Sequence, residues 1–208
     1  MHRLMVAWRD MRVESSVALK EWAVLCALVG AGRHSVLLRK GGIREPRPAG
    51  QDGTFVAEHR RFWLLPTFFH LREPDRAGDL APEALALAPD LLASAPPAGR
   101  LRLELFAEVV ATHEVAERER LRPLAGAHGL SEACVDGRFA YRRPGLVVLI
   151  LRAWRSRQAI EIADRAEYAG CVSWVHLEAA LADEAEPVLS DAAHAARVAA
   201  ITAALEAT

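Results

Sequence analysis

A pair of cations followed by two glycines is the first pattern in the sequence that could bind a ligand. Arg39 and Lys40 directly precede Gly41 and Gly42. An arginine can bind an oxyanion through two parallel hydrogen bonds, a lysine adds a point charge, and glycines let backbone N–H groups approach closely. The pattern therefore predicts a phosphate site, although no P-loop sequence is present. The alternative is an ordinary turn with solvated cations.

The two lysines of the chain are conspicuous because nearly all other basic residues are arginines. Of 26 basic residues, only Lys20 and Lys40 are lysines. A compact ammonium group aims three donors freely, which a planar guanidinium cannot do. We therefore expect both lysines to occupy positions with a specific role, with chance survival as the alternative. Lys20 precedes Glu21, a carboxylate that could act as an acid or a base.

Four consecutive polar residues, 58–61, interrupt an otherwise apolar stretch. In an extended strand, Glu58 and Arg60 would share one face and His59 the other. Glu58 could act as a general base or metal ligand, and His59 as an acid or base near neutral pH. His70 lies a short distance beyond the same stretch and could reach the same ligand. The alternative is a cross-strand pair between glutamate and arginine at a sheet edge.

A third candidate is the segment 168–174, which contains Cys171. A cysteine beside a histidine could be a nucleophile, but no cysteine-hydrolase signature surrounds Cys171, and a cysteine in an apolar strand usually belongs to the core. A metal set drawn from His59, His70 and His128 has no diagnostic spacing. We therefore expect no metal site, and no cofactor can be named from the sequence.

Hydrophobic patterns predict the elements that position these residues. Strands are expected at 17–28, 34–39, 55–65, 101–111, 145–153 and 171–177. Gly30 and Gly32 separate the first two strands, which predicts a β-hairpin. The run 145–153 is apolar throughout and should be a buried central strand.

One strand and two helices have clearer patterns. In 101–111, the residues Leu101, Leu103, Leu105, Ala107 and Val109 alternate with polar ones, which predicts that they share one face. Residues 114–128 read as a helix that Pro123 disturbs. Ser190 is expected to cap a C-terminal helix.

Together these elements predict an α+β fold: a single domain with a mostly antiparallel sheet, helices packed on it and a C-terminal helix. We take residues 1–16 as an N-terminal extension and 17–208 as the domain. Within it, the Ala- and Pro-rich stretch 73–100 is expected to be a surface excursion that covers one edge.

Composition limits the class of protein. The chain has 208 residues, a formal charge of −1 and 52% hydrophobic residues, which excludes wholesale disorder and a polycation. Residues 1–72 carry 12 basic and 6 acidic side chains, whereas 166–208 carry 1 basic and 7 acidic ones. These regions could pair with each other, or leave a basic face for an anionic ligand.

The sequence also predicts the compartment. The longest nearly unbroken apolar run, 22–32, is shorter than the roughly 20 residues of a membrane span, and the N-terminus shows no signal peptide. Cys26, Cys134 and Cys171 are odd in number and lack CxxC spacing, which argues against a disulfide framework and a structural zinc site. We expect a cytoplasmic protein without a membrane partner.

Several segments resemble a bacterial and archaeal family of unknown function, catalogued as domain of unknown function 1802. The matching sequences are ALKEWAVLCAL (18–28), SVLLRKGGIRE (35–45), FVAEHRRFWLLPTFFH (55–70), LRAWRS (151–156) and YAGCVSWVHL (168–177). Both lysines lie within them. The resemblance groups the chain but implies no activity, because the family has none established. The first 16 residues and 73–100 depart from its pattern.

The leading hypothesis is a protein that binds a phosphate-bearing ligand, either a nucleotide or a nucleic acid, and possesses acid or base groups if it also hydrolyses it. The alternative is a non-catalytic module that binds another protein or has a structural role, and a metal-dependent nuclease is a third reading. Convergence of Lys20, Lys40, Glu58 and His59 in one open pocket would favour the ligand site. Scattered or covered side chains would favour the protein-binding module.

Overall fold

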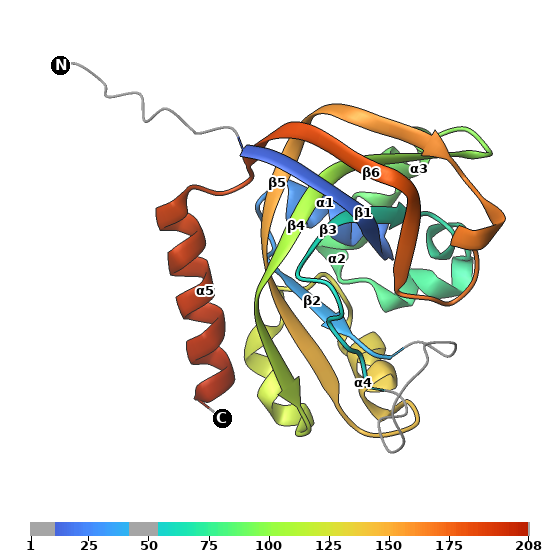
Figure 1. Cartoon of the computed structure of the whole chain (residues 1–208). Helices are drawn as coiled ribbons and strands as arrows, with labels where there is room; N and C mark the ends of the chain where they lie inside the picture. Colours follow the sequence, from blue (N-terminus) through green and yellow to red (C-terminus); the bar gives the residue numbers. More distant parts are fainter. Residues whose placement is uncertain (1–10, 42–53, 208) are drawn as a thin grey trace.

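The computed structural model describes residues 11–41 and 54–207 (Figure 1). Its strands are β1 (Met11–Trp22), β2 (Val36–Arg39), β3 (Arg61–Thr67), β4 (Arg100–Val115), β5 (Leu146–Ala163) and β6 (Trp174–Pro187). Its α-helices are α1 (Ala23–Gly30), α2 (Pro82–Leu85), α3 (Ala88–Ala93), α4 (Glu132–Ala140) and α5 (Asp191–Glu206). Short 3₁₀ turns are η1 (His70–Arg72), η2 (Pro74–Asp79), η3 (Arg118–Leu124) and η4 (Ala166–Tyr168).

The strands form one sheet in the order β2-β5-β4-β3-β1-β6, and β5 also pairs with β6. That additional pairing closes β5, β4, β3, β1 and β6 into a barrel, with β2 attached to the outside edge of β5 (Figure 1). Every pairing is antiparallel except that of β1 with β3. The predicted α+β fold with a mostly antiparallel sheet is therefore confirmed.

Large aromatic side chains fill the interior of the barrel. Trp63 and Phe106 meet edge to face with ring centroids 5.3 Å apart, and Trp154 lies 6.3 Å beyond Phe106. A second, larger core lies between the outer face of the sheet and α1, and it contains Leu64, the neighbour of Trp63 on β3. Successive residues of a strand thus serve different cores, which gives the barrel apolar surfaces inside and outside.

An irregularity in the pairing of β4 with β5 overturns one prediction from the alternating pattern. Between Leu103 and Leu105 the register shifts, because Leu103 pairs with Ile160 but Leu105 pairs with Arg155. Leu103 packs inside the barrel, whereas Leu105 belongs to the outer core with α1. The expected single face is therefore wrong, because the strand changes at this irregularity which of its side chains face the interior.

The predicted strand 17–28 and its hairpin are also wrong. β1 ends at Trp22, and the next residues form α1, which is buried on nearly all sides. A helix that is apolar all round lacks the periodicity that would distinguish it from a buried strand. β2 pairs with β5, while β1 pairs with β3 and β6, so the strands expected to form the hairpin are not neighbours.

Two further boundaries differ from the prediction. β3 begins only at Arg61, so 55–60 precede the strand instead of lying within it. The segment 114–128 is not one helix: β4 continues to Val115, and η3 follows with Pro123 inside it. Proline lacks the N–H that an α-helix requires there. The helix α4 was not among the predicted elements.

The C-terminal helix is confirmed together with its cap. The Ser190 hydroxyl accepts a hydrogen bond from the Ala193 amide at 3.0 Å, as expected for an N-cap. The helix α5 lies along one side of the barrel (Figure 1), and Leu205 is buried near its end. Arg120 of η3 donates a hydrogen bond to the carbonyl of Leu205 at 2.7 Å, which fixes that end.

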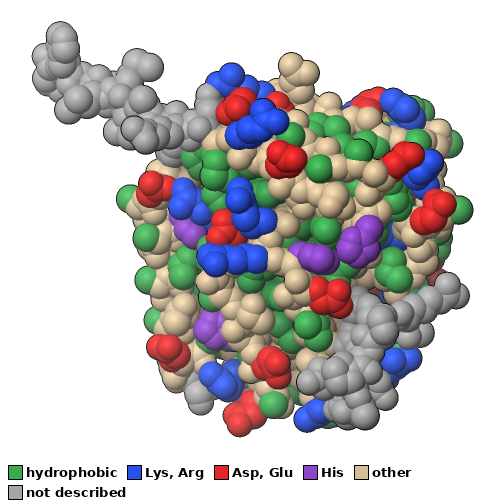
Figure 2. Space-filling view, viewed as in Figure 1, with side chains coloured by type: hydrophobic (Ala, Val, Ile, Leu, Met, Phe, Trp, Pro, Cys, Tyr) green, Lys and Arg blue, Asp and Glu red, His purple; other side chains and the backbone are tan. Residues whose placement is uncertain are grey.

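The basic first part of the chain and the acidic last part contain neighbouring strands of the sheet. β1 pairs with β6, and the register places Arg12 opposite Glu184. On the face shown in Figure 2, basic and acidic side chains are interspersed. In the described part of the chain, no helix is both long and apolar enough to cross a bilayer.

Candidate functional site

The parallel pairing of β1 and β3 determines where the principal cleft lies. Because parallel strands run in the same direction, their carboxyl ends meet at one edge, where Glu21 pairs with Pro66 and Trp22 with Thr67. The Thr67 hydroxyl donates a hydrogen bond to the carbonyl of Glu21 at 3.1 Å. A cleft of about 800 Å³ opens beside these ends and is bounded by residues 96–101 and 168–172.

Cations outnumber anions along the walls of this cleft. The lining cations are Lys20, Arg39, Arg72, Arg100 and Arg138, and the lining carboxylates are Glu21 and Asp164. These residues come from separate strands, turns and helices. Cations that converge on one concave surface raise the local concentration of anionic ligands.

Lys20 is the lining cation that lies near the carboxyl end of β1. It is partly buried, and within the described residues its ammonium donates to the carbonyl of Gly170 at 3.1 Å. Burial lowers the pKa of Lys20, while Asp164 and Cys171 oppose the change. Because an ammonium group has three donors, this geometry leaves donors that can meet a ligand.

The neighbouring Glu21 is committed to an ion pair. Its Oε2 accepts from Arg39 Nη1 at 2.7 Å, and the two side chains are only 2% and 11% exposed. Oε1 of Glu21 accepts from the amide of Trp22 at 2.9 Å. Arg39 also donates to the carbonyl of Lys20 at 3.1 Å. Glu21 therefore positions Arg39 and the end of β1, and its oxygens are already occupied as acceptors.

Aromatic rings lie beside the cations. The His70 ring packs against Trp22 with centroids 4.8 Å apart, and the Arg138 guanidinium lies 5.3 Å from the centre of the Trp22 ring. His70 Nδ1 lies 3.2 Å from a carboxylate oxygen of Glu73. Phe69, which also lines the cleft, is 68% exposed. An exposed ring next to cations is a surface on which a planar ligand can stack.

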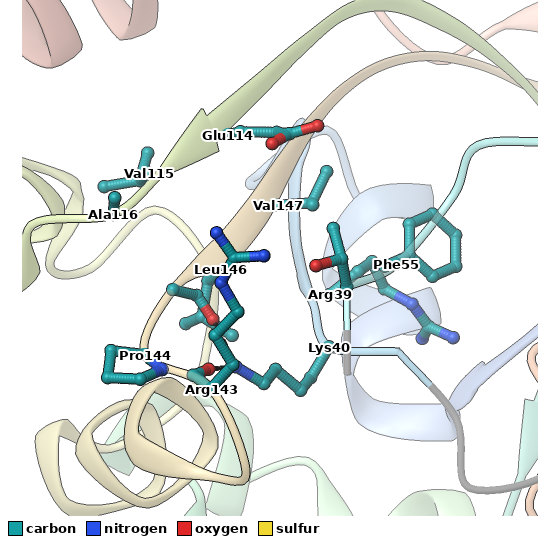
Figure 3. A pocket seen from close by; sticks show the side chains of 12 residues that line it. Arg39, Lys40, Phe55, Glu114, Val115, Ala116, Arg143, Pro144, Leu146 and Val147 are labelled. Carbon is teal, nitrogen blue, oxygen red and sulfur yellow. Dashed lines mark hydrogen bonds between the residues drawn. The ribbon is translucent and has the colours of Figure 1, made fainter. Parts of the chain in front are cut away.

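Lys40 occupies a different place. Its ammonium donates to the carbonyl oxygens of Phe139 at 3.3 Å, Gly145 at 2.7 Å and Arg143. These carbonyls belong to the end of α4 and the turn before β5, beside a small pocket of about 90 Å³. Figure 3 shows Lys40 extending toward this turn while Arg39 points away from it, as strand alternation predicts. All three donors of Lys40 therefore hold backbone.

The remaining predicted residues lie elsewhere. Glu58 is exposed on the segment before β3, and the ring of His59 contacts those of Trp174 and His176 at 5.1 and 5.6 Å. Arg60, 74% exposed, pairs with Glu108 at 2.8 Å.

The glycines that follow β2 complete the predicted set. Gly41 is buried directly after the strand. Gly42 lies outside the described residues, so its predicted role in phosphate binding stays a prediction.

The structure thus brings Lys20, Glu21, Arg39 and His70 to one cleft, and leaves Lys40, Glu58, His59 and Arg60 outside its lining. The four side chains whose convergence would favour the original ligand site do not meet.

Other residues of the cleft were missed by sequence reasoning. Arg72, Arg138 and Asp164 have no local motif, and only the fold places them there. The segment 168–174, the third candidate from the sequence, lines the cleft through residues 168–172, and Cys171 is exposed. In the described ranges, no group of three or more His, Cys, Asp or Glu side chains is arranged to hold a metal ion.

The architecture defines a small barrel protein whose cleft opens at the ends of its single parallel strand pair. The chain belongs to the family described as Domain of unknown function (DUF1802), whose model matches residues 18–200. This confirms the predicted resemblance. None of the curated proteins matches the chain.

Some solved structures are distantly similar. The ASCH protein from Zymomonas mobilis matches with a TM-score of 0.41 and 16% identity, over 78% of this chain and 87% of that chain. A tyrosine-to-phenylalanine variant of the same protein matches with a TM-score of 0.39 and 17% identity, over 78% and 89%.

Proposed function

We propose that the cleft beside Lys20 binds a phosphate-bearing ligand with a planar base, either a free nucleotide or a short single-stranded stretch of nucleic acid. The observation that carries this proposal is the combination of a roughly 800 Å³ cleft with five lining cations and an exposed aromatic ring. Volumes of about 300–1,000 Å³ are typical of sites for small ligands.

The chemistry of the lining assigns parts of the ligand to parts of the cleft. Phosphate oxygens are expected at Lys20 and the nearby arginines, because charge-assisted hydrogen bonds to oxyanions are the strongest that these groups make. A base is expected to stack on Phe69, an interaction that contributes about 1–3 kcal/mol per base in single-stranded nucleic-acid binding. Glu21 is already paired with Arg39, so we propose that the cleft binds the ligand and we include no hydrolysis step.

Calorimetric titration with adenosine monophosphate and with a short single-stranded oligonucleotide tests the proposal. Each titration is run at low and high salt on the wild type, Lys20→Met, Phe69→Ala and a control, Arg122→Gln, which changes an exposed arginine on η3. We expect salt-sensitive binding that both cleft variants weaken about tenfold and the control leaves intact. Binding that is absent, or equal in all variants, would refute the proposal.

The two ligand arms decide the source of the phosphate. Tight binding of the mononucleotide alone assigns the cleft to free nucleotides, whereas binding that requires the oligonucleotide assigns it to nucleic acid.

A protein partner is the second candidate, and the exposure of Phe69 favours it. Aromatic residues are enriched at protein interfaces. In that case no nucleotide would bind. Phe69→Ser would reduce the amount of partner protein recovered in a binding assay, whereas Lys20→Met would not.

A further inference from the structure

A second cavity lies on the outer side of the barrel, apart from Lys20. Its volume is about 280 Å³, and it is enclosed by α1, α3 and the outward faces of β3 and β4. Leu64, Phe68, Leu91 and Leu105 supply apolar walls. The cavity and the cleft share only Pro66, Phe68 and Pro96 among their linings, so a thin wall divides them.

Two features of the backbone create this space. The helix α1 presents small residues to it, Ala23, Ala27 and Gly30, which leave room where longer side chains would pack. The irregular pairing of β4 with β5 at Leu103 and Leu105 places Leu105 on the outer side of the sheet, where it lines the cavity.

Arg155 of β5 lines the cavity and contacts the end of α1. Its Nη2 donates to the carbonyl of Gly30 at 2.9 Å, and its Nη1 lies 3.5 Å from Glu104. A Cβ atom on Gly30 would lie 2.8 Å from Arg155 Nη2, so only glycine admits the guanidinium at this position without movement.

Arg102 of β4 has the corresponding role at the end of α3. Its Nη1 donates to the carbonyl of Ser94, the residue that caps α3, and its Nη2 to Glu161, both at 3.3 Å. Each arginine therefore donates a hydrogen bond to a carbonyl at the C-terminal end of one of the two helices that flank the cavity. A guanidinium carries five N–H donors, so both groups retain donors after these contacts.

We propose that this cavity binds a small amphipathic carboxylate, with its hydrocarbon body between α1 and Leu105 and its carboxylate on Arg155 and Arg102. Each arginine has one carboxylate beside it, Glu104 at 3.5 Å from Arg155 and Glu161 at 3.3 Å from Arg102, so a ligand carboxylate would bind to the donors that these long ion pairs leave. Fixed guanidinium groups match a carboxylate through paired hydrogen bonds. This inference does not depend on the proposed function of the cleft.

Titration with octanoate tests the site, with butanoate and octanol as ligand controls. Octanoate should bind most tightly, because butanoate lacks apolar area and octanol lacks the charge. In spectra of the methyl-labelled wild-type protein, protons of bound octanoate should show cross-relaxation with the methyl groups of Ala23 and Ala27.

Two variants locate the binding. Ala27→Leu fills the cavity and should abolish octanoate binding, while Arg155→Gln should weaken it about tenfold. Arg122→Gln serves as the matched control, and nucleotide binding should be unchanged in Ala27→Leu. Octanoate binding that is absent in the wild type, or cross-relaxation only with methyl groups elsewhere, would overturn the proposal even if Ala27→Leu did not fold.

Discussion

The two lysines of this chain lie in different surroundings, Lys20 at a large cleft and Lys40 among backbone carbonyls. Lys20 lies at the edge of a large cleft, and its hydrogen bond within the described residues goes to the carbonyl of Gly170. Lys40 lies beside a small pocket and donates to three backbone carbonyls at the junction of α4 and β5. The comparison indicates that the same ammonium group holds backbone in one place and, in the cleft where we propose a ligand, keeps donors available.

The ion pair of Glu21 and Arg39 lies between these regions, since Arg39 lines both cavities. Removing it should have the largest effect. We expect Glu21→Ala to lower the free energy of unfolding by about 3 kcal/mol, because a nearly buried guanidinium loses its carboxylate.

Chemical denaturation measures that loss, and the matched control is Glu119→Ala, which breaks an exposed pair on η3. If Glu21→Ala lost no more unfolding free energy than the control, the ion pair of Glu21 and Arg39 would not stabilise the fold where the two regions meet.

Lys40→Met is the next largest change. The three carbonyls lose a charged donor, so we expect a loss of about 2 kcal/mol in unfolding free energy. Nucleotide affinity should stay at the wild-type value, because Lys40 does not line the cleft. Denaturation and titration of the same preparation measure both quantities, and weakened nucleotide binding in a folded Lys40→Met protein would break the distinction between the lysines.

Lys20→Met should give the reverse result. We expect about tenfold weaker nucleotide binding and a change in unfolding free energy of less than about 1 kcal/mol, since within residues 11–41 and 54–207 the substitution removes one hydrogen bond, to Gly170. The same pair of measurements applies. If the Lys20→Met protein bound nucleotide normally but unfolded easily, Lys20 would have a structural role like that of Lys40.

The smallest effect concerns pH. Burial lowers the pKa of Lys20, so its ammonium loses the proton at a lower pH than that of an exposed lysine. Nucleotide affinity should therefore decline as the pH rises, and the decline should begin at a lower pH than the titration of an exposed lysine would produce. Lys20→Arg stays charged and should flatten this decline. Identical pH profiles for the wild type and Lys20→Arg would show that deprotonation of Lys20 does not cause the decline in affinity.

Much of the fold could be predicted from local patterns. The alternating strand at Leu101, the apolar run before Ala153 and the helix capped by Ser190 all occur. The helix α1 could not be distinguished, because its buried surroundings remove the polar face that marks a helix. The change of side near Leu105 shows in the sequence only as two adjacent apolar residues, Leu105 and Phe106, and it becomes clear in the register of the two strands.

The candidate site was predictable only in part, for a related reason. Lys20, Glu21 and Arg39 could be selected by residue type, but their neighbours depend on a parallel pairing between β1 and β3. Nothing in either segment specifies that partner, since the pairing is set by the closure of the whole barrel. Arg138 reaches the cleft from α4, a helix that has no strong periodic signal.

The position of β1 also determines when the barrel can form during synthesis. Among the described strands, β1 leaves the ribosome before the others, but one of its two neighbours, β6, leaves after them. Until residues 174–187 emerge, the wall stays open and the aromatic interior around Trp63 and Phe106 lacks one side. Such nascent chains expose apolar surface and unpaired edges to water, so nascent chains that end before β6 should aggregate, whereas chains that include β6 should not.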